Sequence, residues 1–218
     1  MTAARGSSAL RRQVIATARA LNALNINRGK AGNVSVRIRG GFLITPSGMP
    51  YEAVRPDDIV AVSDAGRTQG TRSPSSEWRL HHAIYVARSE LAAIVHAHSP
   101  FATALACLDR GIPSFHYMVA AAGGKDIRCA RYATFGTAAL AAHTVKALAG
   151  RRACLMSHHG MVAAGASLER ALALAVDVEA LAEVYCRALA VGEPTTLPAR
   201  EMRAVLKQFA LYGQRSSG

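Results

Sequence analysis

Aromatic residues and long runs of charge are scarce in this sequence of 218 residues. Phe, Trp and Tyr make up 6% of the chain, and Lys and Arg never run longer than two in a row although they outnumber Asp and Glu by 26 to 14. A nucleic-acid surface combines basic stripes with aromatic side chains that stack on bases. We therefore expect no nucleic-acid partner, and interpret the net charge of +12 as a solvated surface that attracts an anionic substrate.

Closely spaced cysteines and long apolar runs are also missing. Cys107, Cys129, Cys154 and Cys186 are widely separated and form no Cys-x-x-Cys pair, which favours reduced thiols in the cytoplasm. No apolar run approaches the ~20 residues that a membrane helix needs, and the N-terminal residues contain no apolar segment typical of a signal peptide. We therefore expect a cytoplasmic protein without a membrane partner.

Hydrophobic periodicity predicts hairpins that alternate with isolated helices. This order favours an α/β fold with three layers, α/β/α, around a mostly antiparallel central sheet. No linker or repeat divides the chain, so we expect a single domain over residues 1–218. Helices are predicted near 8–24, 77–91, 101–108, 137–150, 167–192 and 198–212, and strands near 34–38, 42–45, 59–63, 94–98, 115–118, 127–130, 153–157 and 160–164.

The apolar run 94–98 carries two histidines with one residue between them. In a strand His96 and His98 point to the same face, two rises of ~3.3 Å apart, a spacing that one metal ion can bridge. Glu77 upstream and the pair His158 and His159 downstream add a carboxylate and a third imidazole. If their elements converge, three imidazoles and a carboxylate make a plausible catalytic zinc site.

The start of the helix near residue 77 carries serines as well as Glu77. Exposed N–H groups and the positive end of the helix dipole favour a bound anion there. Each of these features also has a purely structural interpretation. Ser75 and Ser76 can be caps, Glu77 can complement the helix dipole, and Gly32 with Asn33 can form a plain turn.

The remaining histidines are less informative by themselves. One member of the adjacent pair His158 and His159 must have a lesser role, such as a surface contact. Structural roles are favoured for four others, which are His81, His82, His116 and His143.

Seven motifs together resemble the class II aldolase/adducin family, and within it most of all the aldolases that act on L-fuculose 1-phosphate. They run in order along nearly the whole chain, and the fifth points most narrowly to the aldolases. The motifs are AGNVSVR (31–37), LITPSG (43–48), PSSEWR (74–79), HAH (96–98), HYMVAAAGG (116–124), YATFGT (132–137) and HHG (158–160).

The resemblance implies a role for each matching residue. His96, His98 and His159 would bind Zn²⁺, for which Co²⁺ or Mn²⁺ can substitute, and Glu77 would lie beside the metal as the acid/base. Tyr117 would exchange a proton in the site of a neighbouring subunit of a homotetramer, and Tyr212 would close over the substrate. The phosphate-binding set would be Asn33, Ser47, Gly48, Ser75 and Ser76, together with Lys30, which departs from the threonine usual in this loop.

The expected reaction is cleavage of a 1-phosphorylated ketose of the L-fuculose 1-phosphate type to dihydroxyacetone phosphate and a small aldehyde such as L-lactaldehyde. Cleavage next to a ketone leaves a carbanion, and zinc on three neutral imidazoles can stabilise its charge. A lysine Schiff base would serve the same purpose, but none of the four lysines lies in an apolar strand. The alternatives are a 5-methylthioribulose or 5-deoxyribulose 1-phosphate aldolase, a sugar-phosphate 4-epimerase or dehydratase, and a binding module like the adducin head.

Overall fold

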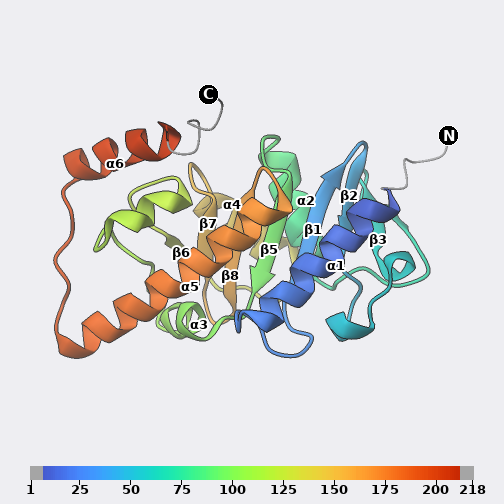
Figure 1. The fold of residues 1–218 in the computed structure, drawn as a ribbon, viewed down its shortest axis with the longest axis horizontal. Coiled ribbons are helices and arrows are strands. Elements are labelled where there is room, and N and C mark those ends of the chain that lie inside the picture. Colours follow the sequence, from blue (N-terminus) through green and yellow to red (C-terminus); the bar gives the residue numbers. More distant parts are fainter. Residues whose placement is uncertain (1–6, 212–218) are drawn as a thin grey trace, which may run out of the picture.

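The computed structural model describes residues 7–211, in which helices cover both faces of one eight-stranded sheet (Figure 1). Neighbouring strands are antiparallel except for β6 and β7, which pair in parallel. The prediction of a three-layer α/β fold with a mostly antiparallel sheet is confirmed. In sheet order the strands are β4 (Thr68–Gln69), β3 (Val60–Ser63), β2 (Gly41–Ile44), β1 (Asn33–Ile38), β5 (Ala93–Ala97), β8 (Gly160–Gly165), β7 (Ala153–Met156) and β6 (Arg128–Ala130).

Three helices pack on the face of the sheet that is in front in Figure 1. They are α1 (Ser8–Ala23), α3 (Pro100–Ala106) and α5 (Leu168–Val191). The side chain of Ser167 accepts a hydrogen bond from the backbone of Arg170 and so caps α5, which supplies many of the buried residues of the larger apolar cluster. The last helix, α6 (Ala199–Leu211), follows an extended connection and contacts the 3₁₀ helix η3 (Tyr117–Ala122).

The opposite face is covered by α2 (Trp78–Ala87) and α4 (Ala138–Ala147), which also pack against each other. Alternation along β5 divides its side chains between the two cores. Val95 belongs to the α5 side and Ile94 to the side of α2 and α4. His96 therefore points to the same side as Ile94, toward the start of α2.

The strand predicted at residues 115–118 is wrong, because this segment leads into the helix η3. Val119 and Ala120 are buried there, and Gly123 ends the turn with a φ of 90°. The sheet edge next to β6 is instead contacted by Ile112, which forms an isolated bridge with Ile127. Phe115 and Met118 pack against the larger apolar cluster, but no strand within residues 7–211 pairs with 115–118, so their apolar pattern does not produce a strand.

Two short 3₁₀ helices, η1 (Tyr51–Ala53) and η2 (Pro56–Asp58), connect β2 to β3. The other predicted strands and helices are found within a few residues of their expected bounds. Among residues 7–211, no helix has the length and apolar content that a membrane crossing requires.

Candidate metal centre and substrate cavity

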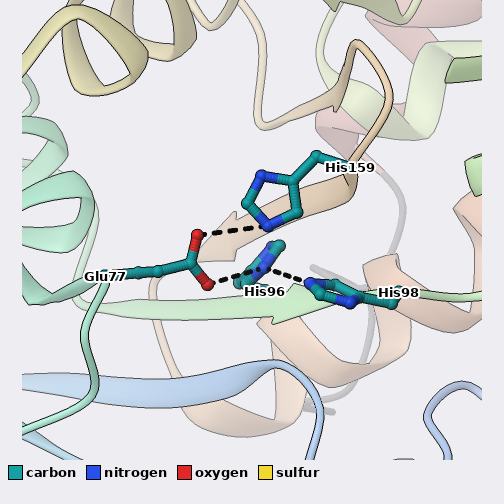
Figure 2. Close-up of side chains that lie close together, drawn as sticks. All are labelled: Glu77, His96, His98 and His159. Atoms are coloured by element: carbon teal, nitrogen blue, oxygen red, sulfur yellow. Dashed lines mark hydrogen bonds and ion pairs between the residues drawn. The ribbon is translucent and has the colours of Figure 1, made fainter. Parts of the chain in front are cut away.

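Four side chains from three separate parts of the chain meet at one end of β5. Glu77 precedes the first turn of α2, His96 lies in β5, His98 follows it, and His159 lies in the turn between β7 and β8. One ligand atom from each of the four lies within 4.8 Å of the others. Figure 2 shows the three imidazoles and the carboxylate pointing toward a common centre, as the sequence predicts.

The turn between β7 and β8 decides which of the two adjacent histidines joins the cluster. His158 has a left-handed φ of 52°, and its N–H donates to the carbonyl of Ala106 at 3.1 Å. His159 then faces Glu77, whereas the ring of His158 contacts Tyr132 edge to face, with 6.0 Å between ring centroids. The next residue must be glycine, because a Cβ at Gly160 would overlap the carbonyl of Ala97.

A backbone contact fixes the proton of His96. Its Nδ1 lies 2.8 Å from the carbonyl oxygen of Met161, and a carbonyl can only accept, so Nδ1 carries a proton and Nε2 is the nitrogen that faces the cluster. Nε2 lies 3.0 Å from Glu77 Oε2 and 3.0 Å from Nε2 of His98. Burial lowers the pKa of His96 and the Glu77 carboxylate raises it, and the net shift is upward, so this point of the cluster favours a positive charge.

The second carboxylate oxygen of Glu77 supports the same conclusion. Oε1 lies 3.2 Å from Nε2 of His159, yet it is a buried oxygen with no hydrogen-bond partner. A buried acceptor without a donor is costly. Three imidazoles and one carboxylate are ligands that Zn²⁺ accepts, so the donor set fits a divalent metal ion.

The electrostatics of the cluster keep its ligands in the required states. Burial opposes ionisation of Glu77, but His96 and His159 outweigh it and hold the pKa of the carboxyl well below its usual range. Burial and the charge of His96 lower the pKa of His98 and of His159 to about 4. At neutral pH both rings are therefore uncharged, the form that binds metal.

The backbone of His98 is held by the buried side-chain amide of Asn27, which also contacts the loop before β1. The N–H of His98 donates to Asn27 Oδ1 at 2.8 Å, and Asn27 Nδ2 donates to the carbonyl of Ala31 at 2.9 Å. A Cβ at Gly32, where φ is 70°, would overlap both Asn27 and the carbonyl of His96. The loop that carries Lys30 is thus packed directly against the metal centre.

A cavity of about 410 Å³ opens beside the metal centre. It brings together all six predicted phosphate-binding residues, and its lining also includes Tyr132 and Phe135, which are 59% and 65% accessible. The prediction missed six lining residues, although four of the motifs contained them. The residues that line it are Lys30, Gly32, Asn33, Pro46, Ser47, Gly48, Ser75, Ser76, Glu77, His98, Tyr132, Ala133, Phe135, His158 and His159.

Of the predicted residues that the structure describes, His96 and Tyr117 do not line the cavity. Tyr117 lies on η3, is 51% exposed and does not line it. Tyr212 lies outside the described residues. Of the phosphate-binding set, Asn33 already uses its amide, because Nδ2 donates to Glu77 Oε2 at 3.1 Å. Ser75 Oγ accepts a hydrogen bond from the N–H of Glu77 at 3.3 Å.

Comparison with known proteins identifies the family of this site. Residues 12–186 match the model of the class II aldolase and adducin N-terminal domain. The chain belongs to this family. A 5-methylthioribulose-1-phosphate/5-deoxyribulose-1-phosphate aldolase of Rhodospirillum rubrum is 54% identical over 208 residues, which cover 95% of this chain and 94% of that protein. The L-fuculose phosphate aldolase of Escherichia coli K12 is 47% identical over 94% of this chain and 96% of its own length.

The solved structures agree with this assignment. An L-fuculose 1-phosphate aldolase superposes with a TM-score of 0.92 at 40% identity, covering 94% of this chain and 98% of that one. The protein is therefore an enzyme of the class II aldolase family, a carbon–carbon lyase, with a Glu/His cluster that can bind a metal ion.

Proposed function

We propose that this class II aldolase is zinc-dependent and cleaves the C3–C4 bond of a ketose 1-phosphate, which releases dihydroxyacetone phosphate and a small aldehyde. The observation that carries the proposal is a cavity lined both by residues of the Glu77 and histidine cluster and by the predicted phosphate-binding residues. A metal ion in the cluster would suit a carbonyl oxygen, and the phosphate-binding residues would suit an anionic phosphate.

His96, His98 and His159 would hold the ion together with Glu77. Bound there, zinc would supply a Lewis acid for the oxygen of the substrate carbonyl. The imidazoles contribute no charge of their own, so most of the charge of the ion stays available to the substrate. The lowered pKa values of His98 and His159 keep these two rings neutral, and the Nδ1–H of His96 directs its Nε2 toward the ion.

Two groups would move the protons. In the cleavage direction Tyr117 takes the proton of the C4 hydroxyl while its own phenolic proton passes to water, the C3–C4 bond breaks, and C4 becomes the aldehyde carbon. Glu77, after taking up a proton from water, delivers it to C3. In the condensation direction the ionised Glu77 removes that proton from dihydroxyacetone phosphate. The lowered pKa of Glu77 means that the ionised form is present in the resting protein at neutral pH.

The phosphate would bind at the opposite end of the cavity, near Lys30. Ser47, Gly48 and Ser76 offer hydroxyl and backbone groups there, and the start of α2 adds the positive end of its dipole. Asn33 and Ser75 lie between this region and Glu77. Lys30 contributes a full positive charge where relatives usually have a threonine, which favours a dianionic phosphate over a neutral group.

For the tail of the sugar we favour 5-methylthioribulose 1-phosphate or 5-deoxyribulose 1-phosphate. The Rhodospirillum rubrum aldolase with this name is 54% identical, against 47% for the Escherichia coli L-fuculose phosphate aldolase. The rings of Tyr132 and Phe135 at the cavity also suit a thioether, because sulfur makes favourable contacts with aromatic rings. L-Fuculose 1-phosphate is the second candidate, supported by the structural neighbour with a TM-score of 0.92.

We further propose that residues 1–218 form one domain and that four copies assemble into a cytoplasmic homotetramer with sites at subunit interfaces. The exposure of Tyr117 and its absence from the cavity of its own chain support a position in a neighbouring site. In that assembly Tyr212 would close over the bound substrate. The four free thiols support a reducing compartment.

The test is a coupled assay for dihydroxyacetone phosphate on zinc-loaded protein. 5-Methylthioribulose 1-phosphate, 5-deoxyribulose 1-phosphate and L-fuculose 1-phosphate are offered side by side, each with a chelator control. We expect chelator-sensitive release with the highest kcat/KM for a substrate with a thiomethyl or methyl tail. No release from any of the three would reject the aldolase assignment and favour epimerase or dehydratase chemistry on the same scaffold.

A further inference from the structure

Behind Glu77, four buried polar side chains form an unbroken chain of hydrogen bonds. Asn33 and Ser35 lie on β1, and His81 and Tyr85 lie on α2, and each is 5% exposed or less. Tyr85 Oη is 2.8 Å from Ser35 Oγ, which is 2.6 Å from His81 Nδ1. His81 Nε2 contacts Asn33 Oδ1, and Asn33 Nδ2 lies 3.1 Å from Glu77 Oε2.

The chain of hydrogen bonds forms because the spacing of the polar residues on α2 matches their spacing on β1. Glu77, His81 and Tyr85 are four residues apart, so they share one face of α2 and of the turn that precedes it. Asn33 and Ser35 are two residues apart and share one face of β1. The side chains of the helix and the strand therefore interleave over four successive contacts, which explains why the four polar groups behind Glu77 can be buried here with hydrogen-bond partners.

The direction of the first two hydrogen bonds follows from the carboxylate. An ionised carboxylate can only accept, so Asn33 must turn its NH₂ group toward Glu77 and its oxygen toward His81. The Asn33 oxygen also can only accept, so His81 must carry a proton on Nε2. The orientation of the Asn33 amide and the tautomer of His81 are thus mutually fixed.

The hydrogen bonds from His81 through Ser35 to Tyr85 have the same direction as the first two. Burial lowers the pKa of His81 to about 3, so the ring has one proton at neutral pH, and Nδ1 accepts from the hydroxyl of Ser35. Ser35 in turn accepts from the hydroxyl of Tyr85, whose pKa is raised by burial. Every donor and acceptor along the chain is matched, and all of them point the same way.

We propose that His81 is a positioning residue for the acid/base Glu77 and acts by fixing the Asn33 amide so that its N–H always faces Oε2. This proposal rests on the role of Glu77 in the proposed function. An Asn33 side chain without His81 can turn its oxygen toward the carboxylate, which repels it. Fixing the amide therefore fixes the rotation of the Glu77 side chain in the cavity.

The arrangement also distinguishes the two oxygens of Glu77. Oε2 accepts the N–H of Asn33, whereas Oε1 has no hydrogen-bond partner. The geometry thus assigns proton exchange with C3 of the substrate to Oε1 and anchoring to Oε2. The chain through His81 keeps this division of roles during the reaction, because a flipped amide would free both oxygens.

The tautomer of His81 can be measured in the unmodified protein. Long-range ¹H–¹⁵N NMR spectra of protein labelled with ¹⁵N-histidine distinguish a protonated Nε2 from a protonated Nδ1, and His81→Leu identifies the signals. We expect the neutral Nε2–H form at pH 7.5. A protonated Nδ1 with a bare Nε2 would overturn the proposal, because Asn33 could not then be fixed by His81.

Kinetics test the consequence for Glu77. His81→Leu is compared with His82→Leu, the neighbouring histidine whose Nε2 contacts the carbonyl of Asp64 away from the chain. We expect kcat of His81→Leu to fall about 10- to 100-fold while KM stays within about threefold, with bound zinc per subunit unchanged, and no comparable loss in His82→Leu. Tyr85→Phe, which removes a single hydroxyl, is expected to lower kcat about two- to threefold.

Two results would contradict a positioning role. Wild-type kcat in zinc-loaded His81→Leu is one, and a loss of kcat that matches a loss of bound zinc or of folded protein is the other. If His81→Leu does not fold, the NMR measurement on the wild type still decides the matter, with signals assigned through Tyr85→Phe. The tautomer does not depend on turnover, so an inactive wild-type protein would reject the proposed function without touching this measurement.

Discussion

At the scale of single residues, the metal centre depends on which nitrogen of each histidine carries the proton. The carbonyl of Met161 holds the proton on Nδ1 of His96 and leaves Nε2 for the cluster. His158 and His159 are chemically identical neighbours, and the left-handed backbone of His158 directs the two rings to different surroundings. One ring joins Glu77, and the other lines the cavity next to Tyr132.

The two adjacent histidines give a matched pair of variants. His159→Ala removes a ligand, so we expect loss of bound zinc and of activity. His158→Asn keeps a residue that tolerates positive φ, so we expect zinc binding near the wild-type level. Zinc per subunit after dialysis, measured by elemental analysis, checks both. Equal zinc loss in the two variants would contradict the assignment of His159.

Glu77→Gln tests the carboxylate apart from the imidazoles. The amide keeps the size of the side chain but cannot take a proton, so we expect zinc to bind while kcat falls about 10²- to 10⁴-fold. Steady-state kinetics on protein of known zinc content measure the effect. Normal turnover in this variant would remove Glu77 as the acid/base.

Buried neutral histidines also make the stability of the metal-free protein depend on pH. The pKa values of His81, His98 and His159 are lowered to about 3, 4 and 4, so the unfolded chain takes up protons first as pH falls below about 6.5. The pKa of His96 is raised, so proton uptake by His96 stabilises the folded protein as the pH falls. The other three histidines have the opposite effect on stability and outnumber it.

The free energy of unfolding should therefore decrease between pH 6.5 and 4 in the presence of a chelator. Fully buried His81 alone contributes up to about 1.4 kcal/mol per pH unit. Urea unfolding at pH 7 and pH 5 checks this, and His81→Leu should weaken the dependence, whereas His143→Gln on the exposed face of α4 should keep it. Equal stability at both pH values would show that these rings are not held neutral.

At the scale of elements, the site depends on how closely β8 approaches β5. The two strands pair antiparallel from Ala93 to Ala97, and the first residue of β8, Gly160, lies against the Ala97 carbonyl. Ala97 lies between the two predicted ligands His96 and His98. A change in this strand contact therefore reaches the metal ligands directly.

Gly160→Ala is expected to destabilise the protein by about 1–3 kcal/mol and to lower its zinc content, because the added Cβ overlaps backbone that cannot move away. Gly192→Ala is the control, since that glycine is extended and has no atom within 4 Å of the added Cβ. Thermal unfolding and zinc analysis of both variants measure the difference. A Gly160→Ala protein as stable and as zinc-rich as the control would contradict the close approach.

At the scale of the whole molecule, one chain supplies the cluster that can bind a metal ion and the residues proposed to bind phosphate, and Tyr117 lies elsewhere. Its 51% exposure on η3 suits contact with another subunit. A homotetramer with sites at its interfaces would then combine Glu77 of one chain with Tyr117 of the next.

Mixing two inactive variants tests this shared site. Tyr117→Phe and Glu77→Gln subunits are dissociated together and reassembled in equal amounts. If neighbouring chains build each site, roughly a quarter of the sites recover both native residues under random assembly, and the mixture gains activity over either variant alone. Each variant reassembled by itself is the control. A mixture no more active than its parents would place Tyr117 outside the shared site.

The sequence by itself determined the local features of this protein. The alternation of β5 put His96 and His98 on one face, helix and turn signals located most elements, and Gly-Asn-x-Ser and His-His-Gly marked the loops around the cavity. These features depend on backbone periods of a few residues, which a sequence shows directly. The resemblance added which distant motifs belong together.

Tertiary structure decided what depends on contacts between distant segments. The apolar residues at 115–118 would suit a strand, but no strand pairs with them and they lead into η3. The fold shows why His159 and not His158 faces Glu77, which the residues alone left open and the resemblance only implied. Only the fold joined Asn33 to both Glu77 and His81, because these contacts span more than forty residues. Contacts between residues so far apart in the sequence depend on the packing and burial of the whole sheet, and no local sequence pattern shows them.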